Sequence, residues 1–401
     1  MFKLSEIKKS LFTSLWFMFL TFPIMVIKVN TITDTVVWRW KNLVIVGVGS
    51  FILSFVWRWA LKRKEQGGSV KENKGVFKKA VLAKTTQYKL PGLIVIGVMI
   101  IVLPFLAPMY HTSVITTALI YVILGLGLNV VVGLGGLLHL GYAAFYAVGA
   151  YTYALLHFHY GLNFWVALPL GALLSAVLGL AIGFPVLRLR GDYLAIVTLA
   201  FGEITRLILE NWNDFSFGPS GIANIARPAI TGVKMKLPQA TIFIYFIAIA
   251  MVVFTIFVVN RLENSRVGRA WEAMREDEIA SQSMGIDLTK AKLLAFSIGA
   301  VWAGFVGVLF AAKTTFINPA SFTVMQSITI LCVVVIGGMG SIPGVIVGAL
   351  VFTLLPEFLR SVSEYRMLVF GITLVFMMIF RPGGMIQKTR NIYKFKDGDI
   401  K

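Results

Sequence analysis

Long apolar stretches dominate this chain and restrict the environment in which it can fold. About twelve of them have the roughly 17–25 residue length that a helix needs to cross the hydrocarbon core of a bilayer. Helices suit this setting because they satisfy every backbone N–H and C=O group without water. The sequence therefore predicts an all-α polytopic membrane protein with about twelve transmembrane helices, between ten and twelve being plausible. The candidate spans are residues 11–27, 42–59, 91–107, 113–132, 137–156, 163–186, 192–210, 239–259, 291–312, 324–340, 342–359 and 365–380.

Composition and charge agree with a lipid bilayer as the surrounding medium. Of the 401 residues, 58% are hydrophobic and 14% are charged, whereas a soluble protein carries about 25% charged residues. The 37 Lys and Arg against 18 Asp and Glu give a net charge of +19. Nucleic-acid binding could explain such a charge, but many of the basic residues gather in one loop and in the C-terminal tail, as the positive-inside rule describes. We therefore expect no nucleic-acid partner, and both termini in the cytoplasm.

A polar, basic segment divides the chain. Residues 62–89 contain glycine and many lysines, which is typical of a solvated boundary. We expect residues 1–90 to form an N-terminal two-span membrane extension that ends in this basic cytoplasmic linker. Residues 91–385 would then form the main transmembrane domain, and residues 386–401 a basic cytoplasmic tail. Residues 211–238 are the longest external loop.

Small residues recur at the spacing that lets helices pack closely in lipid. Gly141 and Gly149 are eight apart, and Gly299, Ala303 and Gly307 follow each other at intervals of four. Two fragments, "VVVGLGG" from residue 130 and "VVVIGGMG" from residue 333, resemble each other and hint at an internal duplication, although they are too short to establish one.

Motifs for catalysis are absent from the sequence. There is no G-x-x-x-x-G-K-[ST] phosphate loop, no H-E-x-x-H zinc motif and no G-x-S-x-G nucleophile turn. The histidines lack metal-ligand spacing. We therefore expect no catalytic residue, no metal site and no cofactor bound by this chain.

Four polar side chains at membrane depth are candidates for lining a pathway: Asn129, His139, Glu203 and Arg206. Intramembrane polar and ionisable groups are expensive and usually face a bundle interior or a water-filled cavity. Glu203 and Arg206 are three residues apart on one helix face, so they can form an ion pair. Glu203 could serve a pathway or packing equally well, whereas packing is the favoured role for Asn129.

The segment "GRAWEAMREDEIASQSMGIDLTKAK", residues 268–292, is densely charged although it lies between two hydrophobic spans. Its small and apolar residues, among them Ala273 and Met274, follow helical spacing, and Gly285 suits a helix end. The sequence predicts a helix over 269–285. One interpretation is an ordinary solvated helix. The other is a short helix parallel to the membrane that docks into a groove of a cytosolic partner.

This segment and its flank resemble the LivM-type permeases of branched-chain amino acid importers, a family of ABC importer permeases. "GDYLAIVTLAFGEITRLILENW" and "GGMGSIPGVIVGA" resemble the same family, so the similarity runs from about residue 110 to 385. The resemblance implies the ABC importer permease fold, here with an N-terminal two-helix extension and a coupling loop at 261–290. The loop departs from the E-A-A-x-x-x-G consensus, because Gly285 lies 13 residues after Glu272.

The resemblance also implies a function and partners. The chain would be the transmembrane permease subunit of an ATP-driven importer of leucine, isoleucine and valine in a bacterial inner membrane. It would pair with a homologous LivH-like permease, two cytosolic ATP-binding subunits that hold ATP and Mg²⁺, and a periplasmic amino-acid-binding protein. The candidate coupling residues are Glu272, Ala273, Arg275, Glu276, Asp277, Glu278 and Gly285.

Two alternatives remain at this point. A permease for urea or short-chain amides would share the architecture, because specificity in such systems rests largely with the binding protein. An ion-coupled secondary transporter would carry acidic residues at broken helices near the membrane midplane, where this sequence offers Glu203 alone.

Overall fold

The computed structural model describes residues 100–186, 191–229 and 236–358, together with short pieces and single positions elsewhere. The predicted spans 11–27, 42–59 and 365–380, the linker 62–89 and the tail 386–401 lie outside the described residues, apart from single positions. The boundaries proposed for the domains stay predictions for this reason. The chain divides into two compact units, Met1–Val98 and Met99–Lys401. In the first, strands β1 (Ile27–Asn30) and β2 (Thr35–Trp38) pair antiparallel, with Ile27 opposite Trp38.

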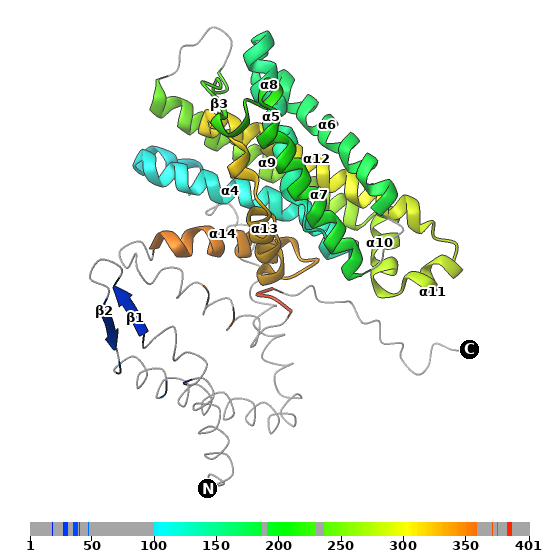
Figure 1. The fold of residues 1–401 in the computed structure, drawn as a ribbon. Helices are drawn as coiled ribbons and strands as arrows, with labels where there is room; N and C mark the ends of the chain where they lie inside the picture. Colours follow the sequence, from blue (N-terminus) through cyan, green and yellow to red (C-terminus); the bar gives the residue numbers. More distant parts are fainter. Residues whose placement is uncertain are drawn as a thin grey trace, which may run out of the picture. The chain divides into compact units, whose positions relative to one another are not determined.

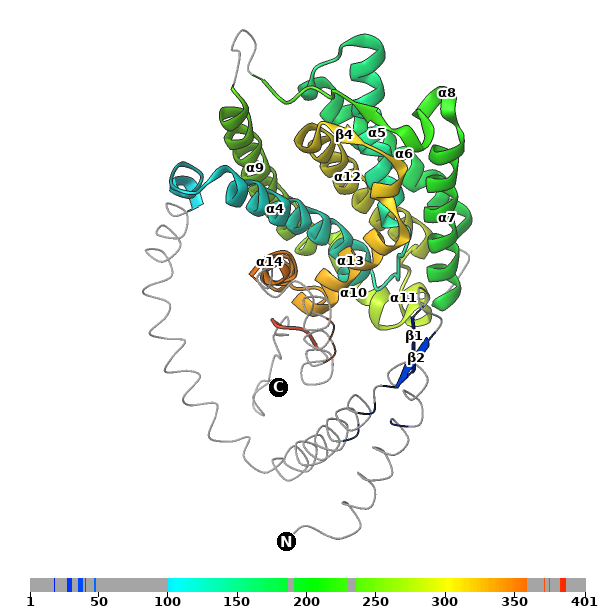
Figure 2. The same cartoon turned by 60° about the vertical axis from the view of Figure 1, so that its left-hand side comes forward.

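The second unit is a bundle of helices (Figures 1 and 2). Its long helices are α4 (Met109–Asn129), α5 (Tyr142–Tyr160), α6 (Phe164–Val186), α7 (Asp192–Asn211), α9 (Leu237–Glu263), α12 (Leu288–Thr314), α13 (Val324–Gly337) and α14 (Ile342–Phe358). The shorter elements are the π-helical turn η2 (Val130–Leu134), α8 (Asn213–Ser216), η3 (Gly218–Ser220), α10 (Arg266–Glu276), α11 (Glu278–Ser283) and η4 (Pro319–Phe322), and the paired strands β3 (Ile222–Ala223) and β4 (Phe316–Ile317).

Several of these helices can cross a bilayer, which confirms the prediction of an all-α polytopic membrane protein. Among the described residues, five segments are long and apolar enough: Met109–Leu134, Phe164–Pro185, Leu237–Glu263, Leu288–Thr314 and Pro319–Gly337. The number of crossings in the whole chain stays a prediction. One boundary was wrong, because the span predicted at 137–156 begins as a helix only at Tyr142. The residues before it leave the helical conformation at the glycine-rich turn, where Gly136 has a positive φ of 69°.

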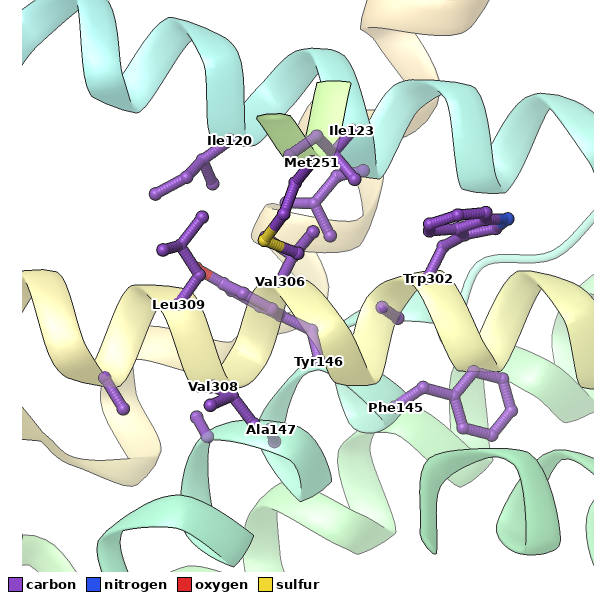
Figure 3. Packing of buried hydrophobic residues seen from close by; sticks show 14 of the residues in the cluster. Ile120, Ile123, Phe145, Tyr146, Ala147, Met251, Trp302, Val306, Val308 and Leu309 are labelled. Carbon is purple, nitrogen blue, oxygen red and sulfur yellow. The ribbon is translucent and has the colours of Figure 1, made fainter. Parts of the chain in front are cut away.

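Helix α12 occupies the centre of the bundle and packs against α4, α5 and α6. Figure 3 shows its two faces. Trp302, Val306 and Leu309 point towards α4 and α9, and Val308 points towards α5. The buried partners labelled on the neighbouring helices are Ile120, Ile123, Phe145, Tyr146, Ala147 and Met251.

Glycines bring the backbones of α5, α6 and α12 into direct contact. A Cβ atom placed on Gly149 of α5 would lie 2.6 Å from the Gly304 Cα atom of α12. One placed on Gly304 would lie 2.6 Å from the Gly171 carbonyl oxygen of α6 and from Ser175 Oγ. Lipid provides no hydrophobic drive between helices, so this close packing is a main source of their association.

We expect Gly149→Ala to destabilise the protein, because its methyl group has only backbone atoms of α12 to displace. Overpacking of this kind costs about 1–3 kcal/mol, which a lower thermal unfolding midpoint in detergent would reveal. The matched control is Gly371→Ala, whose Cβ would meet no atom within 4 Å. Equal midpoints for the two variants would contradict the close contact.

Candidate functional site

Two short helices, α10 and α11, join α9 to α12. Ser265 is the N-cap of helix α10, and its hydroxyl accepts the N–H of Gly268 at 3.2 Å. Asp277 is the N-cap of helix α11, and its carboxylate accepts the N–H groups of Ile279 at 2.8 Å and Ala280 at 3.0 Å. The prediction of one helix over 269–285 was therefore wrong. Asp277 adopts an extended conformation (φ −157°, ψ 115°), because an aspartate side chain can replace the helical hydrogen bonds as an N-cap.

The end of α11 follows the sequence prediction. Gly285 has a φ of 83°. Its N–H donates to the backbone carbonyl oxygen of Gln282 at 3.0 Å, and the N–H of Ile286 donates to the backbone carbonyl oxygen of Ser281 at 3.1 Å. These two bonds form a Schellman motif, which favours glycine at this position. Asp287 then caps α12 by accepting the N–H of Lys290 at 3.1 Å. The backbone and ammonium groups of Lys290 hold the pKa of the Asp287 carboxyl below its usual range.

Trp271 fastens α10 to the body of the protein. Its side chain is fully buried and packs in a cluster that includes Val259 of α9 and Phe296 of α12. The indole N–H donates to the carbonyl oxygen of Ala291 at 2.7 Å. Because a buried indole N–H needs a partner, this bond fixes α10 against the first turn of α12.

A buried ion pair fastens α11 to the same turn. Lys292 Nζ lies 2.7 Å from Glu278 Oε1, and the two side chains are 4% and 26% exposed. A second pair nearby, Lys290 with Asp287 at 3.1 Å, is 81% and 49% exposed. Burial makes the first pair much more sensitive than the second to the loss of one partner. The carboxylate of Glu278 therefore stabilises the contact between α11 and α12 within this chain.

Arg275 links α10 to two glycine-rich turns. Its guanidinium donates a hydrogen bond to the carbonyl oxygen of Gly133. Its side-chain stem fills the space beside Gly136, where a Cβ atom would lie 2.8 Å from Arg275 Cγ. Nη1 lies 3.3 Å from the Cβ position of Gly340, and Asn129 Oδ1 accepts the N–H of Gly340 at 2.8 Å. The two fragments that resemble each other in sequence therefore meet beside Arg275.

The other predicted coupling residues lie at the surface of the segment. Glu272 and Glu276 are exposed, and Ala273 is half-buried. Two large apolar side chains, absent from the predicted set, are also strongly exposed: Ile279 at 67% and Met284 at 84%. The small and apolar residues predicted to form one stripe along a helix over 269–285 are distributed over two helices, because Asp277 separates α10 from α11. An isoleucine within a polar helix was the sequence signal for this surface.

Asn129 and His139 are both buried between helices. The His139 ring stacks on Phe145 at 5.4 Å between centroids and meets Phe296 edge-on at 5.0 Å. Within the described part of the chain, neither ring nitrogen has a hydrogen-bond partner, and the same holds for Asn129 Nδ2. The structure thus places these two candidates in packed interior rather than beside an open space.

Glu203 and Arg206 form an ion pair on α7, with 2.9 Å between Arg206 Nε and Glu203 Oε1. Arg206 Nη1 also lies 2.5 Å from Glu210 Oε2. The cluster therefore contains a third charge that the predicted set missed, although Glu210 follows Arg206 at the i,i+4 spacing of helical pairs. All three side chains keep contact with the surface.

The long apolar helices of the bundle define a multi-pass membrane protein. A family model described as "Branched-chain amino acid transport system / permease component" matches residues 110–378, and the chain belongs to this family. It is 47% identical over 342 residues to the LivM permease of the high-affinity branched-chain amino acid transport system of Salmonella typhimurium, covering 80% of each chain. The LivM protein of Escherichia coli K12 is 46% identical over the same length and coverage.

A more distant relative comes from the same transport system. The LivH permease protein of Escherichia coli K12 is 26% identical over 305 residues, which cover 70% of this chain and 95% of that protein. No solved structure matches the chain.

We expect Lys292→Gln to loosen α11 from α12, since it leaves Glu278 without its buried cation. The cost should be about 2 kcal/mol, below that of a fully buried pair because Glu278 keeps some contact with water. Hydrogen exchange of the amides in 278–283, followed by mass spectrometry, should become faster. The matched control is Lys290→Gln, two residues away in the exposed pair. Equal protection in both variants would show that the buried pair does not hold α11.

Proposed function

We propose that this chain is the transmembrane permease subunit of an ATP-driven importer of leucine, isoleucine and valine, located in a bacterial inner membrane with both termini in the cytoplasm. The observation that carries the proposal is the two-sided construction of α10 and α11. One side is anchored to α12 by Trp271 and Glu278, and the other side exposes Ile279 and Met284. The similarity to the LivM proteins supports the substrate class.

The partners follow from this role. A LivH-like permease would form the second half of the pathway, in keeping with the similarity of this chain to LivH itself. Two cytosolic ATP-binding subunits would hold ATP and Mg²⁺, because this chain carries no phosphate-loop motif. A periplasmic amino-acid-binding protein would deliver the substrate to the external surface, where residues 211–238 form the longest loop. Residues 1–90 would add the two-span extension, residues 91–385 the permease domain and residues 386–401 the cytoplasmic tail.

The residues of this segment have three different roles in this proposal. Glu272, Glu276, Ile279 and Met284 would contact the ATP-binding subunit, because their side chains are exposed on α10 and α11. Arg275 and Glu278 would pass its movement inwards, because each binds an element of the transmembrane body. Asp277 and Gly285 shape the segment by capping α11 at its two ends.

Contact between α11 and the ATP-binding subunit can be tested by replacing the two exposed apolar residues. We expect the double variant Ile279→Asp, Met284→Asp to reach the membrane in normal amounts but to lose the copurifying ATP-binding subunit and leucine uptake. Loss of an interface centre costs about 2 kcal/mol or more, which is over tenfold in affinity. Radiolabelled leucine uptake and quantitative copurification would measure both effects.

Gln282→Asp is the matched control, since it adds a negative charge to the exposed surface of α11 without removing an apolar side chain. Normal copurification and uptake in the double variant would show that α11 is an ordinary solvated helix. The same result in the control and the double variant, with both inactive, would assign the effect to charge alone.

A further inference from the structure

A small pocket lies at the end of the bundle opposite to α10 and α11. It has a volume of about 90 Å³ and is lined by residues from the first turns of α4 and α9, the last turn of α12 and the loop after β3. Helices α9 and α12 each run from this end of the bundle to the end that carries α10 and α11. Each is 27 residues long, or about 40 Å at the rise of an α-helix. If α10 and α11 face the cytoplasm, as in the proposed function, this pocket faces the external side.

Two cations, Lys313 and Arg227, line the pocket. Lys313 reaches it from α12 and Arg227 from the loop. Lys313 Nζ donates to the hydroxyl of Thr117, but in the described ranges neither cation forms an ion pair with an acidic side chain. Removing a cation from water is costly unless an anion compensates it. Lys313 and Arg227, both half-buried beside this small pocket, therefore favour an anion there.

The remaining walls suit the other parts of an amino acid. The hydroxyls of Thr116 and Thr241 donate to carbonyl oxygens of their own helices, at 2.7 Å and 3.0 Å. Their oxygen atoms are thereby left as acceptors, which is what an ammonium group requires. Met109 and Ile244 provide apolar surface between these polar groups. The pocket thus combines two cations, hydroxyl acceptors and an aliphatic wall.

We propose that this pocket is a binding site for a zwitterionic aliphatic amino acid at the external mouth of the permease. Lys313 and Arg227 bind the carboxylate, the hydroxyl oxygens of Thr116 and Thr241 accept from the ammonium group, and Met109 and Ile244 contact the side chain. The proposal rests on the proposed function, because that function supplies the sidedness and the amino acid class. It adds a site within this chain where substrate is held after release from the binding protein.

Lysine near a helix C-terminus has a second explanation, because it interacts favourably with the last carbonyl groups. This explanation predicts an effect on stability alone. It gives no reason for Arg227 to share the pocket, and no reason for the occupant to need a carboxylate. Ligand binding therefore separates the two explanations.

The test is direct binding of radiolabelled leucine to the purified full chain in lipid nanodiscs, without ATP or binding protein. We expect Lys313→Gln and Arg227→Gln each to weaken binding about tenfold or more, the loss of one charge-assisted hydrogen bond. Lys313→Arg should keep most of the affinity because it keeps the charge. Lys290→Gln, an exposed lysine at the other end of α12, should bind as the wild type does.

Competitors identify the chemical group that is recognised. Unlabelled leucine should displace the label, whereas leucinamide, which lacks the carboxylate, and acetate, which lacks the side chain and ammonium group, should not. Competition by leucinamide equal to that by leucine would overturn the proposal, as would unchanged binding in both Gln variants or no saturable binding by the wild-type chain. Competition by acetate at equal concentration would reduce the pocket to a general anion site and also overturn it. Uptake and copurification of the ATP-binding subunit, measured separately, decide the proposed function on their own.

Discussion

Close backbone contact around α12 is the interaction on which the rest of this structure depends. Glycines on α5 and α12, and the facing carbonyl group on α6, allow three backbones to approach within the distance of a methyl group. In lipid this packing replaces the hydrophobic drive that holds a soluble protein together. Because α12 is held along its length, its two ends are fixed relative to each other. Its first turn carries the anchors of α10 and α11, and its last turn carries Lys313. One packed helix thus joins the two ends of the bundle.

Helices α10 and α11 contact the body of the protein by two separate routes. Trp271 and Glu278 bind the beginning of α12. Arg275 instead donates to the carbonyl oxygen of Gly133, in the turn after α4. Next to this turn, Asn129 Oδ1 accepts the N–H of Gly340, which lies between α13 and α14. The wide π-helical turn at Val130–Leu134 lies within this second route, and such turns are frequent at functional sites. A displacement of α10 would therefore act on α4, α12 and the α13–α14 turn together.

The sequence predicted the features that depend on neighbours along the chain. Apolar runs located the long helices, Gly285 indicated the end of α11, and the spacing of Glu203 and Arg206 allowed their ion pair. Features that depend on the fold could not be predicted. The partners of Arg275 and Glu278 lie 142 and 14 residues away in the chain, and their charges alone suggested a solvated surface. Asp277 was misread because its preference for an N-cap competes with the helical propensity of its neighbours.

The bonds of Trp271 and Glu278 to the first turn of α12 lead us to expect that α10, α11 and α12 move as one rigid body during transport. Pulsed electron spin resonance between labels at Gln282 and Phe316, both exposed and at opposite ends of α12, tests it directly once the single cysteine, Cys332, is replaced. In the assembled complex, we expect the same distance between these labels with and without bound ATP. A label on Gln282 and one on the second permease should meanwhile change their separation. A shift of about 5 Å or more between Gln282 and Phe316, the size of a one-turn displacement, would show that α11 moves relative to α12.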